Sequence, residues 1–126
     1  MQINDKIIID TATSYLNHPY SKEFDCVKFV RKVYQTSGII IPKLDPSPPP
    51  LEFNIQKEQL KNPPIGHIMF LKDREDPRKH RAWTHIVIIN SKKSCIHCSL
   101  FFGRKVVITP LEEIFKKYDF VESVYT

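Results

Sequence analysis

Cys26 is the residue of this chain whose type and position are best suited to covalent chemistry. It follows Asp25 and opens a run with helical apolar spacing, in which Phe29, Val30 and Val33 fall on one stripe with it. A thiol in the first turn of a helix feels the positive end of the backbone dipole, which favours the thiolate. The thiolate is the nucleophile that a cysteine hydrolase or acyltransferase needs. The alternative is a buried, inert cysteine that packs as a small apolar group.

Two of the five histidines are candidates for the base that such a thiol requires. His85 begins the apolar run 86–89, and His97 lies twelve residues later, in the next predicted strand. Adjacent antiparallel strands joined by a short turn bring residues at this spacing side by side, so the two rings could interact. A polar ring in an apolar segment costs free energy unless it has a partner. The alternative is that His85 merely ends a strand and His97 is a core histidine bonded to backbone.

A metal site competes for the second of these strands. Cys95, His97 and Cys98 lie within four residues, and a Cys-x-x-Cys with a histidine inside it is typical of zinc sites. Side chains alternate along a strand, so Cys95 and His97 face one way and Cys98 the other. No second Cys-x-x-Cys is present to complete a tetrahedral site. We therefore expect neither a metal nor another cofactor.

The first half of the chain predicts the helices that would position Cys26. Residues 4–17 have an apolar helical face, with Asn4 or Asp5 as cap and Pro19 beyond the end. Residues 25–37 form a second helix that Gly38 is well placed to terminate. Three further segments follow: a short extended run at 39–41, a proline-rich surface loop at 42–50 and a short helix within 51–61.

The second half predicts the strands that would position the histidines. Apolar and alternating runs indicate strands at 68–71, 86–89, 94–100 and 106–109, then a helix from Pro110 and an edge strand at 119–126. Two helices followed by a run of antiparallel strands indicate an α+β fold, with the helices segregated to one side of the sheet. At 126 residues we expect a single domain, 1–126.

Composition and charge narrow the range of partners. The net charge of +5 is consistent with nucleic-acid binding, but the densest charged stretch, 72–81, interleaves three acids with five bases. A phosphate-binding surface is more often of one sign and carries aromatic side chains for stacking. We therefore expect a solvated loop there and no nucleic-acid partner, although a basic loop could attract an acidic substrate.

Cysteine usage and the N-terminal residues bear on the compartment. Three cysteines do not indicate a disulfide framework, so a reducing compartment is expected. The apolar run Ile7–Ile9 is too short for a secretory signal, and Asp5 and Asp10 flank it. No segment has the length of a membrane span. These observations predict cytoplasmic synthesis, with export by a non-classical route if the protein acts outside the cell.

Taken in order, these segments resemble the NlpC/P60 family of papain-like cysteine peptidases, which typically act on bacterial cell-wall peptides. The match runs from about Ala12 to Ile114, most of the chain. Six segments carry it: 12–20 (ATSYLNHPY, opening helix and Pro-Tyr), 25–26 (DC, nucleophile), 38–42 (GIIIP, exit from the catalytic helix), 65–70 (IGHIMF, the Gly-Asp strand), 85–89 (HIVII, histidine strand) and 96–99 (IHCS, strand of the third polar residue).

The resemblance implies a papain-like NlpC/P60 fold and a role for each candidate residue. Cys26 would be the nucleophile, His85 the general base and His97 the group that orients it. Tyr20 would lie in the site and help to stabilise the oxyanion or bind substrate, and the backbone amide of Cys26 would be an oxyanion donor. Asp25 and Lys28, which flank this position, are also candidate substrate or oxyanion residues.

Several positions depart from the family pattern. Val27 and Lys28 replace the usual Ser-Gly after the nucleophile, His67 replaces the aspartate of the Gly-Asp pair, and Val87 replaces a small glycine. Lys28 would therefore crowd or charge a place that is usually small. The catalytic set is intact while the substrate-binding set is altered.

The leading expectation is a cysteine hydrolase that cleaves peptide or isopeptide bonds through an acyl-enzyme, with a murein stem peptide as the first candidate substrate. A deamidase, acyltransferase or thioesterase acting on a protein or lipid is the second hypothesis, and a non-catalytic binding module with the same fold is the third. The sequence does not predict an oligomeric state.

Overall fold

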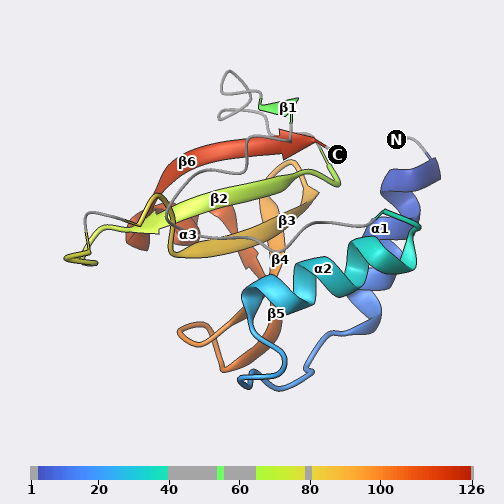
Figure 1. The fold of residues 1–126 in the computed structure, drawn as a ribbon, viewed down its shortest axis with the longest axis horizontal. Helices are drawn as coiled ribbons and strands as arrows, with labels where there is room; N and C mark the ends of the chain where they lie inside the picture. Colours follow the sequence, from blue (N-terminus) through green and yellow to red (C-terminus); the bar gives the residue numbers. More distant parts are fainter. Residues whose placement is uncertain (1–2, 40–53, 56–64, 79–80, 126) are drawn as a thin grey trace.

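The computed structural model describes residues 3–39, 54–55, 65–78 and 81–125 (Figure 1). Within them, helices and strands follow one another in an α+β order, as expected. The elements are α1 (Ile3–Ser14), α2 (Cys26–Thr36), β1 (Asn54–Ile55), β2 (Ile68–Asp73), β3 (His85–Ser91), β4 (Ser94–Ser99), β5 (Lys105–Pro110), α3 (Leu111–Lys117) and β6 (Tyr118–Tyr125).

The described strands form one antiparallel sheet in the order β1-β6-β2-β3-β4-β5. Strands β2 to β5 are a meander, so the predicted pairing of consecutive strands is confirmed. The last strand is present, but its predicted edge position is wrong, because β6 lies between β2 and β1. After β5 the chain continues through α3 and returns as β6 to the edge of β2 that β3 does not occupy (Figure 1). There β6 pairs with the backbone N–H and C=O groups of β2.

Each face of the sheet is covered by different helices. Because side chains alternate along a strand, Ile86 and Ile88 of β3 pack with α1 and α2, while Val87 and Ile89 pack with α3. The prediction that the N-terminal helices pack on an antiparallel sheet is confirmed. The expectation that all helices lie on one side of the sheet is wrong, because the apolar residues of α3 pack on the face opposite to the one that α1 and α2 cover.

Helix α2, which carries Cys26, begins and ends close to the predicted bounds. The carboxylate of Asp25 caps its start and accepts hydrogen bonds from the amides of Val27 and Lys28, at 3.1 and 2.9 Å. Gly38 follows its end with a φ of 88°, a left-handed conformation that favours glycine. The cap fixes Cys26 as the first residue of the helix.

Helix α1 is shorter than predicted and ends at Ser14. The next residues leave the helix because they pair with the edge strand β5. The amide of Asn17 donates to the carbonyl of Val106, and the amide of Val106 donates to the carbonyl of His18, both at 2.9 Å. These hydrogen bonds hold the segment before Tyr20 against the sheet.

Most of residues 40–64 lie outside the described part of the chain, and so do most of the predicted extended run at 39–41, the loop at 42–50 and the helix at 51–61. Asn54 and Ile55 are the exception, and they pair with β6 as a strand rather than a helix. Within the described residues, no helix is both long enough and apolar enough to cross a bilayer.

Candidate active site

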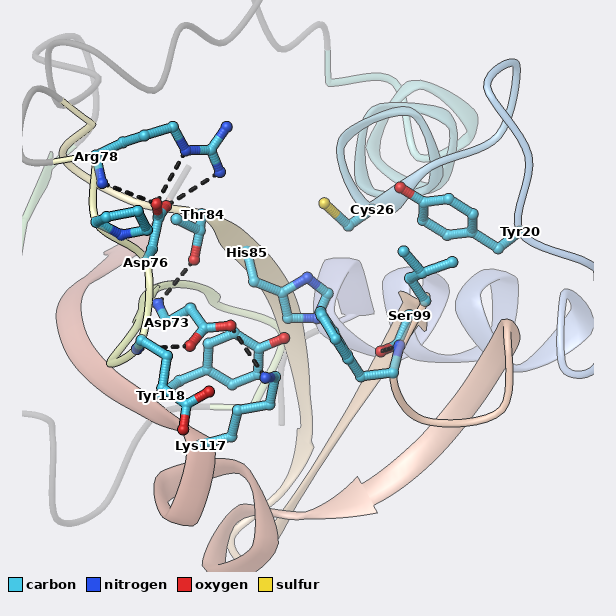
Figure 2. A pocket seen from close by; sticks show the side chains of 14 residues that line it. Tyr20, Cys26, Asp73, Asp76, Arg78, Thr84, His85, Ser99, Lys117 and Tyr118 are labelled. Carbon is cyan, nitrogen blue, oxygen red and sulfur yellow. Dashed lines mark hydrogen bonds and ion pairs between the residues drawn. The ribbon is translucent and has the colours of Figure 1, made fainter.

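Cys26 and His85 line the same cavity, which has a volume of about 590 Å³ (Figure 2). Cys26 enters it from the start of α2 and His85 from the start of β3. The backbone amide of Ile86, next to His85, also hydrogen-bonds to the Cys26 sulfur. Ile86 pairs with Phe70 of β2 and lies outside the stretch in which β3 pairs with β4, so on that side β3 is next to α2. The two candidate catalytic elements therefore meet at this point.

The predicted contact between the two histidines is confirmed. The Nε2 of His85 lies 2.7 Å from the Nδ1 of His97, and both side chains are buried. On its other side, the Nε2 of His97 lies 2.8 Å from the hydroxyl of Thr109 in β5. The neighbouring strands β3, β4 and β5 thus contribute one residue each to a chain of buried hydrogen bonds that ends at the cavity.

Burial keeps both imidazoles neutral. The pKa of His85 is lowered well below 6.5, first by burial and then by the neighbouring His97. Burial also lowers the pKa of His97, to about 4. A neutral His85 has one ring nitrogen available to accept a proton, which is the state a general base requires.

The Cys26 thiol is protonated in this resting site. Its pKa is raised to about 12, first by burial and then by the charge of Asp25, while the amides of Ile86 and Val27 act in the opposite direction. The prediction that the start of the helix favours the thiolate is therefore wrong for the unliganded protein. Desolvation of a charged sulfur and a nearby carboxylate outweigh the stabilisation that these backbone amides give to the thiolate.

Two tyrosines flank the pair (Figure 2). Tyr20, predicted to lie in the site, is half-buried and lines the cavity. Tyr118, which sequence reasoning missed, stacks on His85 with ring centroids 5.2 Å apart and an interplanar angle of 19°. Burial is the main cause of the raised pKa of each phenol. Because it starts β6, Tyr118 reaches His85 only through the crossover, which its sequence position does not reveal.

Comparisons with known proteins identify this architecture. No family model matches the sequence, and no curated protein matches it. Solved structures do match it, among them the following three. An NlpC/P60 family protein from Bacillus cereus ATCC 10987 is 23% identical with a TM-score of 0.74, over 94% of this chain and 39% of that one. NlpC2 from Trichomonas vaginalis is 18% identical with a TM-score of 0.78, over 100% of this chain and 49% of that one.

A third structure, described as similar to lipoprotein of the NLP/P60 family, comes from Staphylococcus aureus subsp. aureus Mu50. It is 18% identical with a TM-score of 0.67, over 98% of this chain and 41% of that one. The chain has the NlpC/P60 fold. It spans less than half the length of each of these proteins, and at these identities the likeness establishes the fold alone.

Asp25 and Lys28 do not line the cavity of this NlpC/P60 fold. The carboxylate of Asp25 caps α2, and the ammonium of exposed Lys28 donates to the carbonyl of Lys22. The side chain of Lys28 thus turns back along the preceding loop, and its predicted effect on the substrate site stays a prediction. The charge of Asp25 contributes to the raised pKa of Cys26.

The charged segment that begins at the end of β2 lines the cavity instead. It was expected to be a solvated loop, yet Asp73, Glu75, Asp76 and Arg78 all contribute to the wall. Asp76 accepts two side-chain hydrogen bonds from Arg78, at 2.9 and 3.1 Å, and these bonds are the main cause of its lowered pKa. The acidic and basic residues that alternate in this segment form ion pairs with one another, among them Lys72 and Arg78 with Asp76, in this wall of the NlpC/P60 fold.

Beside this charged wall, the cavity has a second wall with apolar side chains. Leu100 and Phe101, after β4, line it while remaining 47% and 63% exposed. The ammonium of Lys117 lies 3.9 Å from the centre of the Phe101 ring and 3.0 Å from the carboxylate of Asp73. Lys117 thus links the charged and apolar walls next to His85.

The strand predicted to compete as a metal site has the expected alternation. Cys95 packs on the α3 side of the sheet and Cys98 on the α2 side, so their sulfurs do not converge. Among the described residues, no group of three or more histidine, cysteine or acidic side chains has an arrangement that could hold a metal ion.

Proposed function

We propose that this protein is a cysteine hydrolase that cleaves amide bonds of peptides through an acyl-enzyme formed on Cys26. The observation that carries the proposal is the meeting of Cys26 and His85 in one cavity, with the far nitrogen of His85 hydrogen-bonded to buried His97. A nucleophile, a base and a group that orients the base are the three parts that thiol catalysis requires.

In this mechanism the proton leaves the sulfur during attack, because the resting thiol is protonated. As the sulfur bonds to the amide carbonyl carbon, its proton passes to the ring nitrogen of His85 that is not bonded to His97. The carbonyl oxygen becomes an oxyanion at the start of α2, where the amide of Cys26, as the first residue of the helix, has no acceptor within it. The imidazolium protonates the leaving amine as the carbon–nitrogen bond breaks. His85 then activates a water molecule, which releases the acid and restores the thiol.

The residues around His85 support this sequence of steps. When His85 takes up the proton, its Nε2–H has an acceptor in the Nδ1 of neutral His97. The stack with Tyr118 restricts rotation of the ring. Both contacts hold the ring of His85 in the orientation that proton transfer from the Cys26 thiol requires.

We propose a cell-wall stem peptide as the first candidate substrate. The fold supports it, and so does the cavity wall, where Asp73, Asp76, Arg78 and Lys117 present both signs of charge. A peptide that carries amino and carboxylate groups fits a wall of this kind better than a polyanion does.

Digestion of purified bacterial murein tests the proposal. The wild-type protein is expected to release soluble peptides whose masses identify the bond cleaved. Cys26→Ala should release none, whereas Cys95→Ala, which removes a buried thiol on the opposite face of the sheet, should retain the activity. Equal release by wild type and Cys26→Ala would contradict the proposed nucleophile, and no release by the wild type would contradict murein as the substrate.

A second candidate keeps the nucleophile and changes the substrate to an acyl ester or thioester of a protein or lipid. Exposed Leu100 and Phe101 on the cavity wall favour it, because they could contact an acyl chain. A panel of thioesters of increasing chain length, assayed beside peptide amides, separates the two candidates. Turnover that rises with chain length would favour the second, and binding of either substrate without turnover would favour a non-catalytic module.

A further inference from the structure

We propose that Thr109 is a positioning residue that sets the direction of the hydrogen bonds running through His97 to His85. This inference rests on the proposed function, in which His85 is the base. The hydroxyl of Thr109 is 2.8 Å from the Nε2 of His97, and Thr109 does not line the cavity. Its effect on a substrate would therefore pass through the two histidines.

The register of the sheet explains how Thr109 reaches His97. Cys95 of β4 lies opposite Thr109 of β5, and His97 lies opposite Val107. Thr109 and His97 are thus diagonal neighbours on the same face of the sheet, two residues apart along the register. Both are buried, so water has little access to either hydrogen-bonding group.

The charge that forms during catalysis dictates the direction of these hydrogen bonds. Once His85 has taken the proton from Cys26, both of its ring nitrogens carry hydrogens. Its Nε2–H must then be accepted by the Nδ1 of His97, because that atom is 2.7 Å away. Neutral His97 carries its own hydrogen on Nε2 in that state, and the hydroxyl oxygen of Thr109 is placed to accept it.

Without this hydroxyl, the same arrangement leaves a buried N–H with no acceptor. Such donors are rarer in proteins than buried acceptors without a donor, because they are costly. His97 would then favour the tautomer with its hydrogen on Nδ1, which points at the Nε2 of His85. That tautomer places the hydrogen of His85 on the nitrogen that should receive the proton of Cys26, so His85 would no longer be a base. The aromatic contact between His97 and Phe102, at 5.5 Å, supplies no replacement acceptor.

A matched pair of variants tests the assignment. Thr109→Val keeps the shape of the side chain and removes the hydroxyl, whereas Thr109→Ser keeps the hydroxyl. For the substrate that the wild type hydrolyses, Thr109→Val is expected to lower kcat by roughly 10- to 100-fold with little change in KM, the scale of one lost buried hydrogen bond. Thr109→Ser should restore most of kcat. Thermal melts of both variants show whether they are folded.

Nitrogen-15 NMR of the imidazoles gives a readout that does not depend on turnover. Wild-type His97 is expected to carry its hydrogen on Nε2, and Thr109→Val should move it to Nδ1. Hydrogen on Nδ1 in the wild type, or an unchanged tautomer and kcat in Thr109→Val, would overturn the inference. Absence of wild-type turnover with the expected NMR result would instead count against the proposed hydrolase and leave the positioning role supported.

Discussion

The Nε2 of His85 lies 2.7 Å from the Nδ1 of His97, in a buried contact between two neutral imidazoles. This contact leaves one ring nitrogen of His85 that is not bonded to His97, and in the proposed mechanism that nitrogen takes the proton of Cys26. A carboxylate in the place of His97 would stabilise a charged His85 by direct attraction. The neutral ring orients His85 without that attraction, so in the proposed mechanism His85 becomes charged only during the attack of the sulfur on a substrate.

The protonation state of Cys26 can be read from its alkylation rate. Because the pKa of its thiol is raised to about 12, the thiolate fraction should rise about tenfold per pH unit between pH 7 and 10. The rate of reaction with iodoacetamide, measured at Cys26 by peptide mass analysis, should rise in parallel without a plateau. Cys95 and Cys98 are buried and should react more slowly at every pH. A plateau below pH 8 would indicate a preformed thiolate–imidazolium pair instead.

Asp25 offers a pair of substitutions that separates its capping role from its charge. Asp25→Asn keeps a good N-cap and removes the negative charge, so it should lower the pKa of Cys26 and speed alkylation at pH 8 with little change in stability. Asp25→Ala also removes the charge but should lower the free energy of unfolding by about 1 kcal/mol, since two amides of α2 lose their acceptor. Urea denaturation measures the stability. An unchanged alkylation rate in Asp25→Asn would mean that this carboxylate does not act on the sulfur.

Tyr118 is expected to act through its ring. Tyr118→Phe keeps the stack on His85 and should retain kcat to within a few-fold, whereas Tyr118→Leu removes the stack and should lower kcat by up to about tenfold. The measurement is steady-state kinetics on the peptide released from murein or on a synthetic equivalent. A larger loss in Tyr118→Phe than in Tyr118→Leu would assign the role to the hydroxyl.

The buried histidines should make the protein sensitive to mild acid. Burial lowers the pKa of His97 from 6.5 to about 4, so between these values the unfolded chain binds a proton that the folded protein does not. The free energy of unfolding should therefore fall as the pH decreases from about 6.5 to about 4, by roughly 3 kcal/mol from His97 alone. His85 and His67, whose pKa values are also lowered mainly by burial, contribute in the same direction.

The substitution His97→Gln isolates the contribution of one residue to that slope. Glutamine keeps a hydrogen-bond acceptor and donor but does not titrate, so the variant should lose less stability between pH 6.5 and 4 than the wild type loses. Urea denaturation at several pH values gives both slopes. Parallel slopes would show that His97 does not carry the predicted proton linkage.

The spacing along the chain that places the two histidines together also applies to a third residue of the site. His85 and His97 are twelve residues apart, and so are His97 and Thr109. The same reasoning about consecutive antiparallel strands that paired the first two residues would have found the third. Thr109 was missed because a threonine in a strand is usually explained by strand preference alone.

Other parts of the site have no signal in local sequence. Tyr118 meets His85 because β6 pairs with β2 after a crossover, and the order of strands in a sheet does not follow from the order in the chain. The alternating charges of 72–81 are equally compatible with a solvated loop and with the paired wall that the structure contains. The direction of the Lys28 side chain depends on a carbonyl of the preceding loop.

The sequence by itself determined that Cys26 starts a capped helix and that His85 and His97 lie on neighbouring strands, because helix caps and strand periodicity are local properties. Only the tertiary structure decided that the thiol is protonated, because desolvation depends on what packs around the sulfur and not on its neighbours in the chain. The helix start that favours a thiolate is therefore present, and its effect is outweighed by the burial that the fold imposes.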